Sequence, residues 1–359
     1  MSVYGDNIKL TVFGESHGEA IGAALYGVPA GFTIDMDKVL LQMARRAPGK
    51  DKTATPRLEK DFPKVISGVL NGKTTGAPIA FVIENTNTKS KDYKGLLDNP
   101  RPAHSDYTAF VKYGGNNDIR GGGHFSGRLT APIVFAGAVL RQILETKGIK
   151  IAAHIGSIAD VNDESFNPVD INDELIEKLS GLSFPLINKS AEDKMRSAVE
   201  SARLDGDSVG GTIECVIKGM PVGIGGPLFD GIEGAIAKAV FGIPAVKGIE
   251  FGSGFSGSLS RGSENNDAFE YKDGNVVTKT NNCGGILGGI SDGMPIIFKA
   301  AIKPTPSISK QQETVNLKTG ENSTLKVHGR HDPCIVPRAV PVVEAAAAIA
   351  VFDLLQGEF

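Results

Sequence analysis

The chain of 359 residues carries 38 lysines and arginines against 41 aspartates and glutamates, a formal net charge of −3 at pH 7. This balance argues against a nucleic-acid-binding protein, because such a protein needs a strongly basic face. The hydrophobic fraction of 41% is sufficient for a large core, so the chain is expected to be globular, and its length predicts about two domains.

Strands and helices are predicted to alternate along the chain. Strands are expected at residues 21–28, 65–70, 79–84, 212–218 and 295–302, and helices at residues 35–46, 130–146, 190–204, 229–241 and 338–355. Asp35 is the expected N-cap of the first helix. Ser190 with Asp193 resembles a capping box that would open the third helix.

A weak internal repeat links two of these strand-to-helix connections. Gly27 to Phe32 and Gly219 to Ile224 share a pattern of glycine, apolar residue, proline, apolar residue, glycine, apolar residue. Each follows a predicted strand and leads to a helix that begins near an aspartate, Asp35 or Asp230. The repeat predicts two β-α halves, roughly 1–205 and 206–359, packed as one body.

The cysteines and the apolar segments predict a soluble, cytoplasmic protein. Cys215, Cys283 and Cys334 are odd in number and lack C-x-x-C spacing, which indicates neither a disulfide framework nor a zinc site. The first residues show no export signal. No window is expected to reach the length of a membrane span, and the nearest, residues 339–355, is interrupted by Glu344 and Asp353.

Three short segments set ionisable side chains into turn-prone glycine and proline frames. They are Gly14-Glu15-Ser16-His17-Gly18, Arg101-Pro102-Ala103-His104-Ser105-Asp106 and Gly329-Arg330-His331-Asp332-Pro333. Arginines suit the binding of carboxylates and phosphates, and an imidazole exchanges protons near neutral pH. Together they favour an enzyme that acts on anionic substrates, although each alone could be a braced loop or a surface ion pair.

Neither a dinucleotide site nor a metal site is predicted from the remaining patterns. Gly252 to Gly257 fits G-x-G-x-x-G, but the following residues read as loop, whereas a dinucleotide site needs a helix to start there. No H-x-x-x-H or H-x-H pair supports a metal site, so none is predicted.

Considered together, six segments closely resemble the signature blocks of the chorismate synthase family, in that family's order. The segments are Gly14 to Gly18, Arg101 to Asp106, Gly121 to Gly123, Gly284 to Ser291, Lys303 to Ser307, and Gly329 to Cys334. The resemblance runs from about Gly5 to Asp353. It implies a shikimate-pathway lyase that eliminates phosphate from 5-enolpyruvylshikimate 3-phosphate by a trans-1,4 route to give chorismate.

The resemblance also implies a cofactor, a fold and an assembly. The cofactor would be reduced FMN, used without net redox change. The fold would be a β-α-β sandwich. With the internal repeat, this predicts an α+β fold of two pseudo-symmetric halves that form one compact body over residues 1–359. The assembly would be a homotetramer.

The resemblance also implies roles for individual residues of this sequence. By resemblance, His104 would protonate the departing phosphate, His17 would donate a proton to the reduced flavin near N1, and Asp332 would act as a base toward N5. The anions of the substrate would be held by cationic side chains, namely Arg46, Lys52, Arg101 and Arg128. The flavin would be held by residues from several segments, namely His124, Phe125, Ser126, Pro244, Ala245, Gly288, Lys303, Pro304, Thr305, Pro306, Ser307 and Arg330.

The sequence departs from the family's common pattern at three places. His124-Phe125-Ser126-Gly127-Arg128 follows the triple glycine where Arg-Ser-Ser-Ala-Arg is usual. Pro244 replaces an asparagine and therefore removes a backbone N–H. Lys52 replaces a common arginine and offers a point charge in place of a planar fork.

Two alternatives from other classes stay open at this stage. A redox flavoprotein would consume a hydride donor in stoichiometric amounts, and a non-catalytic anion-binding protein would need the arginines but not the histidines. Whether the protein reduces its own flavin with NADPH also stays open.

Overall fold

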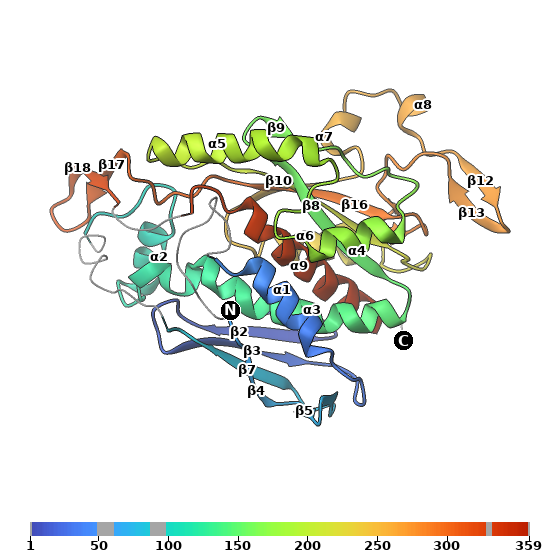
Figure 1. The fold of residues 1–359 in the computed structure, drawn as a ribbon, viewed down its shortest axis with the longest axis horizontal. Coiled ribbons are helices and arrows are strands. Elements are labelled where there is room, and N and C mark those ends of the chain that lie inside the picture. Colours follow the sequence, from blue (N-terminus) through green and yellow to red (C-terminus); the bar gives the residue numbers. More distant parts are fainter. Residues whose placement is uncertain (1, 49–60, 87–97, 328–331, 358–359) are drawn as a thin grey trace.

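Two five-stranded antiparallel sheets enclose a layer of helices in this protein (Figure 1). The computed structural model describes residues 2–48, 61–86, 98–327 and 332–357. Because both sheets need an apolar partner for their inner faces, the helices between them form the centre of the core.

The first sheet has the strand order β1-β2-β3-β7-β4. Its strands are β1 (Val3–Tyr4), β2 (Lys9–Gly14), β3 (Ala20–Tyr26), β7 (Ile79–Glu84) and β4 (Lys64–Ser67). Ile79, Phe81 and Ile83 alternate along β7 and are fully buried. Since side chains alternate between the two faces of a strand, this spacing directs one apolar face toward the helices.

The second sheet has the order β11-β16-β10-β8-β9 and is covered on both faces. Its strands are β11 (Val246–Phe251), β16 (Ile296–Ile302), β10 (Gly211–Lys218), β8 (Lys150–Ile158) and β9 (Val161–Asn162). The central helices cover one face, and α4 (Asp173–Gly181) and α5 (Glu192–Leu204) lie over the other (Figure 1). A second apolar cluster joins Ala152 and Val216 of the sheet to Ile176 and Leu179 of α4.

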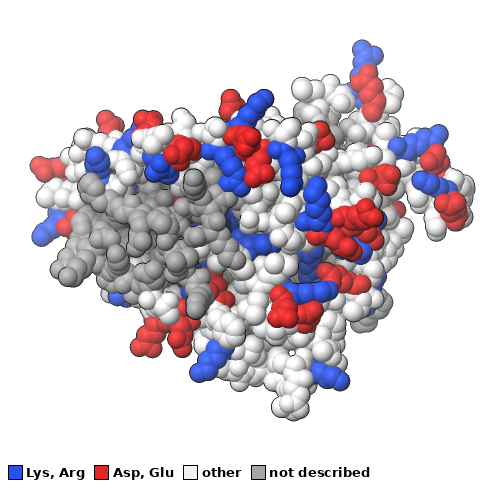
Figure 2. Space-filling view, in the orientation of Figure 1, with Lys and Arg blue, Asp and Glu red and all other residues white. Residues whose placement is uncertain are grey.

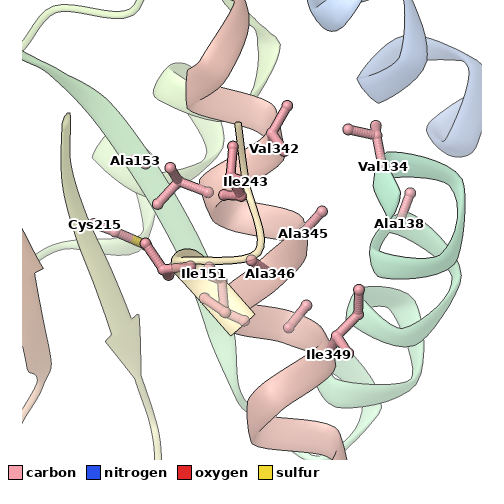
Figure 3. Packing of buried hydrophobic residues seen from close by; sticks show 14 of the residues in the cluster. Val134, Ala138, Ile151, Ala153, Cys215, Ile243, Val342, Ala345, Ala346 and Ile349 are labelled. Atoms are coloured by element: carbon pink, nitrogen blue, oxygen red, sulfur yellow. The ribbon is translucent and has the colours of Figure 1, made fainter. Parts of the chain in front are cut away.

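The two longest helices, α3 (Thr130–Thr146) and α9 (Val336–Gly357), pack against each other at the centre. Figure 3 shows Val134 and Ala138 of α3 facing the α9 residues Ala345 and Ile349. A Cβ added at Gly137 would lie only 2.4 Å from Cα of Ala345. The small residues therefore let the two backbones approach closely.

Two shorter helices, α1 (Met36–Arg46) and α6 (Ile232–Val240), complete the central layer. A buried carboxylate on α9 ties this layer together, because Glu344 accepts hydrogen bonds from Arg45 Nη1 (2.5 Å), Arg141 Nη1 (3.4 Å) and the backbone N–H of Ala153 (2.9 Å). Breaking one side of such a buried network typically costs about 3–5 kcal/mol.

The remaining elements are short and lie around this body. They are α2 (Asp106–Tyr113), α7 (Gly254–Gly257), α8 (Gly262–Asn265), and the paired strands β5 (Val69–Leu70) with β6 (Lys73–Thr74), β12 (Phe269–Lys272) with β13 (Asn275–Thr278), β14 (Ile286–Leu287) with β15 (Ile290–Ser291), and β17 (Gln311–Asn316) with β18 (Glu321–Lys326). On the face in Figure 2 acidic and basic side chains intermingle.

Several predicted elements are confirmed. The strand at residues 79–84 and the helix at residues 130–146 have the predicted bounds. Asp35 caps α1, since its side chain accepts from the N–H groups of Asp37 and Lys38. The mixed α and β class is confirmed, as two sheets and a helical layer require.

Other details of the prediction are wrong. No capping box opens α5: the helix begins at Glu192 without a side-chain cap, and Asn188 caps the short turn before it. The strand at residues 65–70 is divided at Gly68, whose φ of 83° interrupts the extended backbone. The helix expected from Phe229 begins at Ile232, after a separate turn at Leu228–Asp230.

The expectation about membrane-span length is also wrong. Residues 120–146 and α9 are long and apolar enough to cross a membrane by length and composition alone. However, 83% and 89% of their apolar windows are buried inside the protein. Both segments are therefore explained as core helices.

Candidate active site

A pocket of about 860 Å³ is bordered by the first turns of α3 and α9 and the carboxyl-terminal end of α6. Its cationic lining comes from distant segments, namely Arg46, Arg101, Arg128, Lys238, Lys303 and Arg338. His104, His124 and Asp332 line the same space. Apolar side chains such as Val12, Ile133 and Phe241 form other parts of the wall. The pocket thus combines positive charge, proton-exchanging groups and an apolar wall.

The loop before α2 places Arg101 and His104 through a single carboxylate, Asp106. Asp106 accepts from the backbone N–H of Arg101 (3.0 Å) and from its Nε (2.7 Å) and Nη2 (2.8 Å). Its Oδ1 also lies 2.6 Å from His104 Nδ1. Burial by itself would raise the pKa of Asp106, but the bonds from Arg101 and His104 outweigh burial and hold that pKa well below its usual range.

The triple glycine forms a turn between two histidine rings. Gly121, Gly122 and Gly123 all have positive φ, which only glycine adopts easily. A Cβ at Gly121 would lie 2.3 Å from the ring of His17, and one at Gly122 would lie 3.3 Å from His104 Nε2. Close approach of both rings therefore requires glycine here.

His17 lies behind this turn. Its side chain is buried, and Ser16 Oγ is 3.1 Å from His17 Nδ1 while it also lies 3.1 Å from the carbonyl of Arg120. Gly121 lines the pocket, whereas His17 is not among its described lining residues. His104 and Asp332 therefore line the pocket, whereas His17 lies behind Gly121.

Two of the arginines share one buried carboxylate. Asp61 accepts from Arg46 Nη1 and from Arg128 Nη1, and all three side chains are almost fully buried. Burial alone would raise the pKa of Asp61, but the two guanidinium groups outweigh burial and lower it. Asp61 belongs to none of the three segments with ionisable side chains, and no pattern in the sequence pairs it with these two arginines.

Arg338, in the first turn of α9, is a further site residue that the sequence interpretation did not assign. Its Nη1 forms an ion pair with Asp332, and its Nε donates to the backbone carbonyl of Arg46 (2.9 Å). The clustering of arginines near the last motif was the available signal. Arg338 lies in the first turn of α9 and lines the pocket, which identifies it as a site residue.

Lys303 joins two loops that border the pocket. Its Nζ donates to the carbonyl of Ala103 (2.9 Å), and its backbone N–H donates to the carbonyl of Ala245 (2.9 Å). Ala103 and Ala245 both have positive φ, of 56° and 74°. Burial, together with nearby Lys247, lowers the pKa of Lys303. The positive φ values of Ala103 and Ala245 are strained, and such backbone conformations persist only where surrounding contacts, here those of Lys303, fix them.

The segment after the triple glycine is anchored by hydrogen bonds. His124 Nε2 lies 2.5 Å from Ser2 Oγ, and His124 Nδ1 lies 2.7 Å from the carbonyl of Gly14. Ser126 accepts from the N–H of Arg128 (3.3 Å), and Phe125 stays partly exposed at the pocket. The residues that replace the family's common pattern therefore still border the pocket.

The other residues assigned by resemblance differ in where they lie. Pro244, Ala245, Thr305, Pro306 and Ser307 line the pocket. Pro304 and Gly288 are not among its described lining residues, and Gly288 lies between β14 and β15. Lys52 and Arg330 lie outside the described residues.

The chain is similar to known proteins over nearly its whole length. The family model described as chorismate synthase matches residues 8–356. Chorismate synthase from Dehalococcoides mccartyi is 47% identical over 350 residues, 98% of this chain and 95% of that protein. The one from Thermococcus kodakarensis is 46% identical over 351 residues, 98% of this chain and 96% of that protein. A crystal structure of chorismate synthase superposes with a TM-score of 0.77 at 28% identity, covering 99% of this chain and 93% of that chain.

Proposed function

This chain belongs to the chorismate synthase family, whose members convert 5-enolpyruvylshikimate 3-phosphate to chorismate, and we propose that the pocket described above binds this substrate together with reduced FMN. The family is one of carbon–oxygen lyases of the shikimate pathway and generally uses reduced FMN.

One observation carries the proposal for the substrate: a near-neutral protein concentrates six cationic side chains around one pocket that also contains His104. The substrate carries two carboxylates and a phosphate, which planar guanidinium groups bind by paired hydrogen bonds. Arg46, Arg101 and Arg128 hold these anions in the proposal, and Arg338 joins them. Lys52 is proposed as a further anion-binding residue.

The residues present fit a flavin as well. A volume of about 860 Å³ is at the upper end for a small-molecule site and leaves room for a second ligand. Among the described residues, Thr305 Oγ1 is buried without a hydrogen-bond partner, although Thr305 borders the pocket. A ligand with polar oxygens would satisfy this hydroxyl, which otherwise costs about 1–3 kcal/mol.

In the proposal, His124, Phe125, Ser126, Pro244, Ala245, Gly288, Arg330 and the segment from Lys303 to Ser307 hold the flavin. The chemistry that reduced FMN supplies when bound is transient electron donation without net redox change. Apolar side chains such as Ile133 and Phe241 exclude water from a flat aromatic ligand.

The protein's own residues handle the protons. His104 donates to the phosphate oxygen as the carbon–oxygen bond breaks, which prevents the build-up of charge on the leaving group. Asp332, held by Arg338, is the proposed base on the flavin side of the pocket. His17, which is held by Ser16 behind the Gly121 turn, is the proposed proton donor to the flavin near N1.

We propose a relationship between the two halves on the basis of their strand order. In the first, β2 and β3 are followed by α1, β4, β7 and α3, and in the second, β8 and β10 are followed by α6, β11, β16 and α9. In the first sheet β7 lies between β3 and β4, and in the second sheet β16 lies between β10 and β11. In each set of four, the last strand in the sequence therefore lies between the second and the third. The loops that leave β3 and β10 have positive φ at equivalent glycines, Gly27 with Gly31 and Gly219 with Gly223. In this arrangement β8 belongs with the second half, so the proposed boundary lies before residue 150, whereas the repeat alone predicts it near residue 205.

The proposed assembly is a cytoplasmic homotetramer. Leu228 and Phe229 are 90% and 95% exposed, and Phe255 and Leu259 are 80% and 88% exposed. Large apolar side chains in such positions favour burial against another copy. Light scattering of the purified protein tests this, and a mass of one chain would contradict it.

The test of function is an anaerobic assay of the full chain with 5-enolpyruvylshikimate 3-phosphate and a limiting pool of FMN pre-reduced with dithionite. The expected result is many chorismate molecules per flavin. One product per flavin would favour the redox flavoprotein, and binding without turnover would favour an anion-binding protein. Adding NADPH in place of dithionite tests whether the protein reduces its own flavin.

A further inference from the structure

Two groups lie close to Nδ1 of His104, and they require opposite states of that nitrogen. Asp106 Oδ1 is 2.6 Å away, and Arg101 Nη2 is 3.2 Å away. A carboxylate only accepts hydrogen bonds, and a guanidinium only donates them. The ring is therefore protonated at Nδ1 if Asp106 is its partner, and unprotonated there if Arg101 is.

The distances decide in favour of Asp106. At 2.6 Å an unprotonated Nδ1 would oppose its lone pair to that of a carboxylate oxygen, with no proton between them. Arg101 Nη2 donates one of its two hydrogens to the same oxygen at 2.8 Å, and its own distance from Nδ1 is longer, at 3.2 Å. The neighbouring Ser105 Oγ, at 3.4 Å from Nδ1, is a weaker partner. The short contact therefore favours a hydrogen on Nδ1 of His104 that faces Oδ1 of Asp106.

The opposite edge of the ring is directed elsewhere. His104 Nε2 lies against Gly122, where an added Cβ would be only 3.3 Å from it. His104 lines the pocket, while Asp106 is 5% exposed and is not among the described lining residues. The carboxylate thus lies behind the imidazole, and Nε2 is the nitrogen available to a ligand.

We propose that Asp106 is a positioning residue that keeps the Nδ1 hydrogen on His104 in every state of the ring, so that the proton delivered to phosphate comes from Nε2 of an imidazolium. This inference rests on the proposed function, in which His104 is the acid. The Nε2–H bond breaks as an O–H bond forms on the departing phosphate. The ring that remains is neutral and still protonated at Nδ1.

The same carboxylate also orients Arg101. Three donors of Arg101 end on Asp106, and the remaining Nη1 donates to Ser307 Oγ (3.1 Å). A variant of Asp106 therefore disturbs both the arginine and the histidine. A test of the proposal has to separate these two effects.

Nitrogen NMR of the full chain labelled with ¹⁵N-histidine makes this separation, because the chemical shifts distinguish protonated from unprotonated ring nitrogens without any activity measurement. The His104→Asn variant assigns the signals by their loss. His154 supplies an internal reference, since its two ring nitrogens lie 3.0 Å from Asp163 and 2.9 Å from Glu214. The spectra are recorded from about pH 5 to about pH 9, a range that spans histidine titration.

In the wild-type protein Nε2 is expected to be the nitrogen that loses its proton as the pH rises, while Nδ1 stays protonated. An unprotonated Nδ1 in the neutral ring would overturn the proposal. Arg101→Lys keeps the carboxylate and should keep the Nδ1 hydrogen, although it weakens substrate binding. Loss of the Nδ1 hydrogen in Arg101→Lys would assign the ring orientation to the arginine and would also overturn the proposal.

Asp106→Asn is expected to release the ring to a mixture of tautomers and to lower kcat by about 10- to 100-fold, the loss that is typical when the residue that orients a metal-binding histidine is removed. Unchanged His154 signals show that the variant is folded. If Asp106→Asn does not fold, the wild-type and Arg101→Lys spectra still decide the matter. Native kcat in a folded Asp106→Asn that has lost the Nδ1 hydrogen would contradict the positioning role, whereas native kcat in His104→Asn would contradict the proposed function.

Discussion

Arg338 donates its Nε hydrogen to the backbone carbonyl of Arg46 at 2.9 Å, across 292 positions of the sequence. This bond connects the start of α9 with the end of α1 at the edge of the pocket. Arg338 therefore links the two helices and also contributes a positive charge to the pocket.

Replacing Arg338 with lysine is expected to weaken substrate binding more than it weakens folding. Lysine keeps the charge but has no planar fork, so it cannot bind Asp332, the Arg46 carbonyl and a substrate anion together. We expect KM to rise about tenfold, equivalent to about 1.4 kcal/mol. Steady-state kinetics under anaerobic conditions measure this, with the exposed Arg203→Lys as the control. An unchanged KM in Arg338→Lys would show that the substrate does not contact this residue.

His104→Ala and His17→Ala are expected to lower kcat about 10²- to 10⁴-fold, because each removes a group that acts in proton transfer. Arg101→Ala should also raise KM, since it removes a group that binds the ground-state anion. Comparing the two parameters across the three variants separates these roles. Near-native kcat in both histidine variants would refute the assignment of the acids.

Gly121→Ala is expected to displace His17. The added Cβ would lie 2.3 Å from the ring, and φ at this position is 60°. We expect a loss of about 1–3 kcal/mol in the free energy of unfolding together with a lower kcat. Urea unfolding and kinetics measure both. Gly181→Ala is the matched control, because nothing lies within 4 Å of the Cβ added there.

His154 should make the stability depend on pH. Burial disfavours the charged ring, but the bonds to Asp163 and Glu214 outweigh burial and raise the pKa of His154 above its ordinary value of 6.5. The stabilisation is therefore complete below about pH 6.5 and is lost as the pH rises through the higher folded-state value.

The check is to compare the unfolding free energy of the wild type with that of His154→Gln from about pH 6 to about pH 9, around the ordinary histidine value. The wild type should lose stability with rising pH relative to the variant. Parallel pH profiles of the two proteins would contradict this account.

The sequence predicted those elements whose signal is local. The cap at Asp35 and the apolar run of α3 depend on a few neighbouring residues, and both were predicted at their observed positions. The start of α5 was misplaced because Asn188, not Ser190, caps the turn that precedes it. The motifs led to Arg101 and His104, but Asp61 and its two arginines come together only through the packing of separate elements.

The first turns of α3 and α9 both border the pocket. The peptide dipoles of a helix sum to about half a positive charge at its amino end, so the two longest helices add a positive potential that belongs to the backbone. No side-chain substitution removes this potential, and no change of pH titrates it. An enzyme that lacks any single arginine should therefore still attract an anionic ligand, and what it loses first is the ligand's orientation.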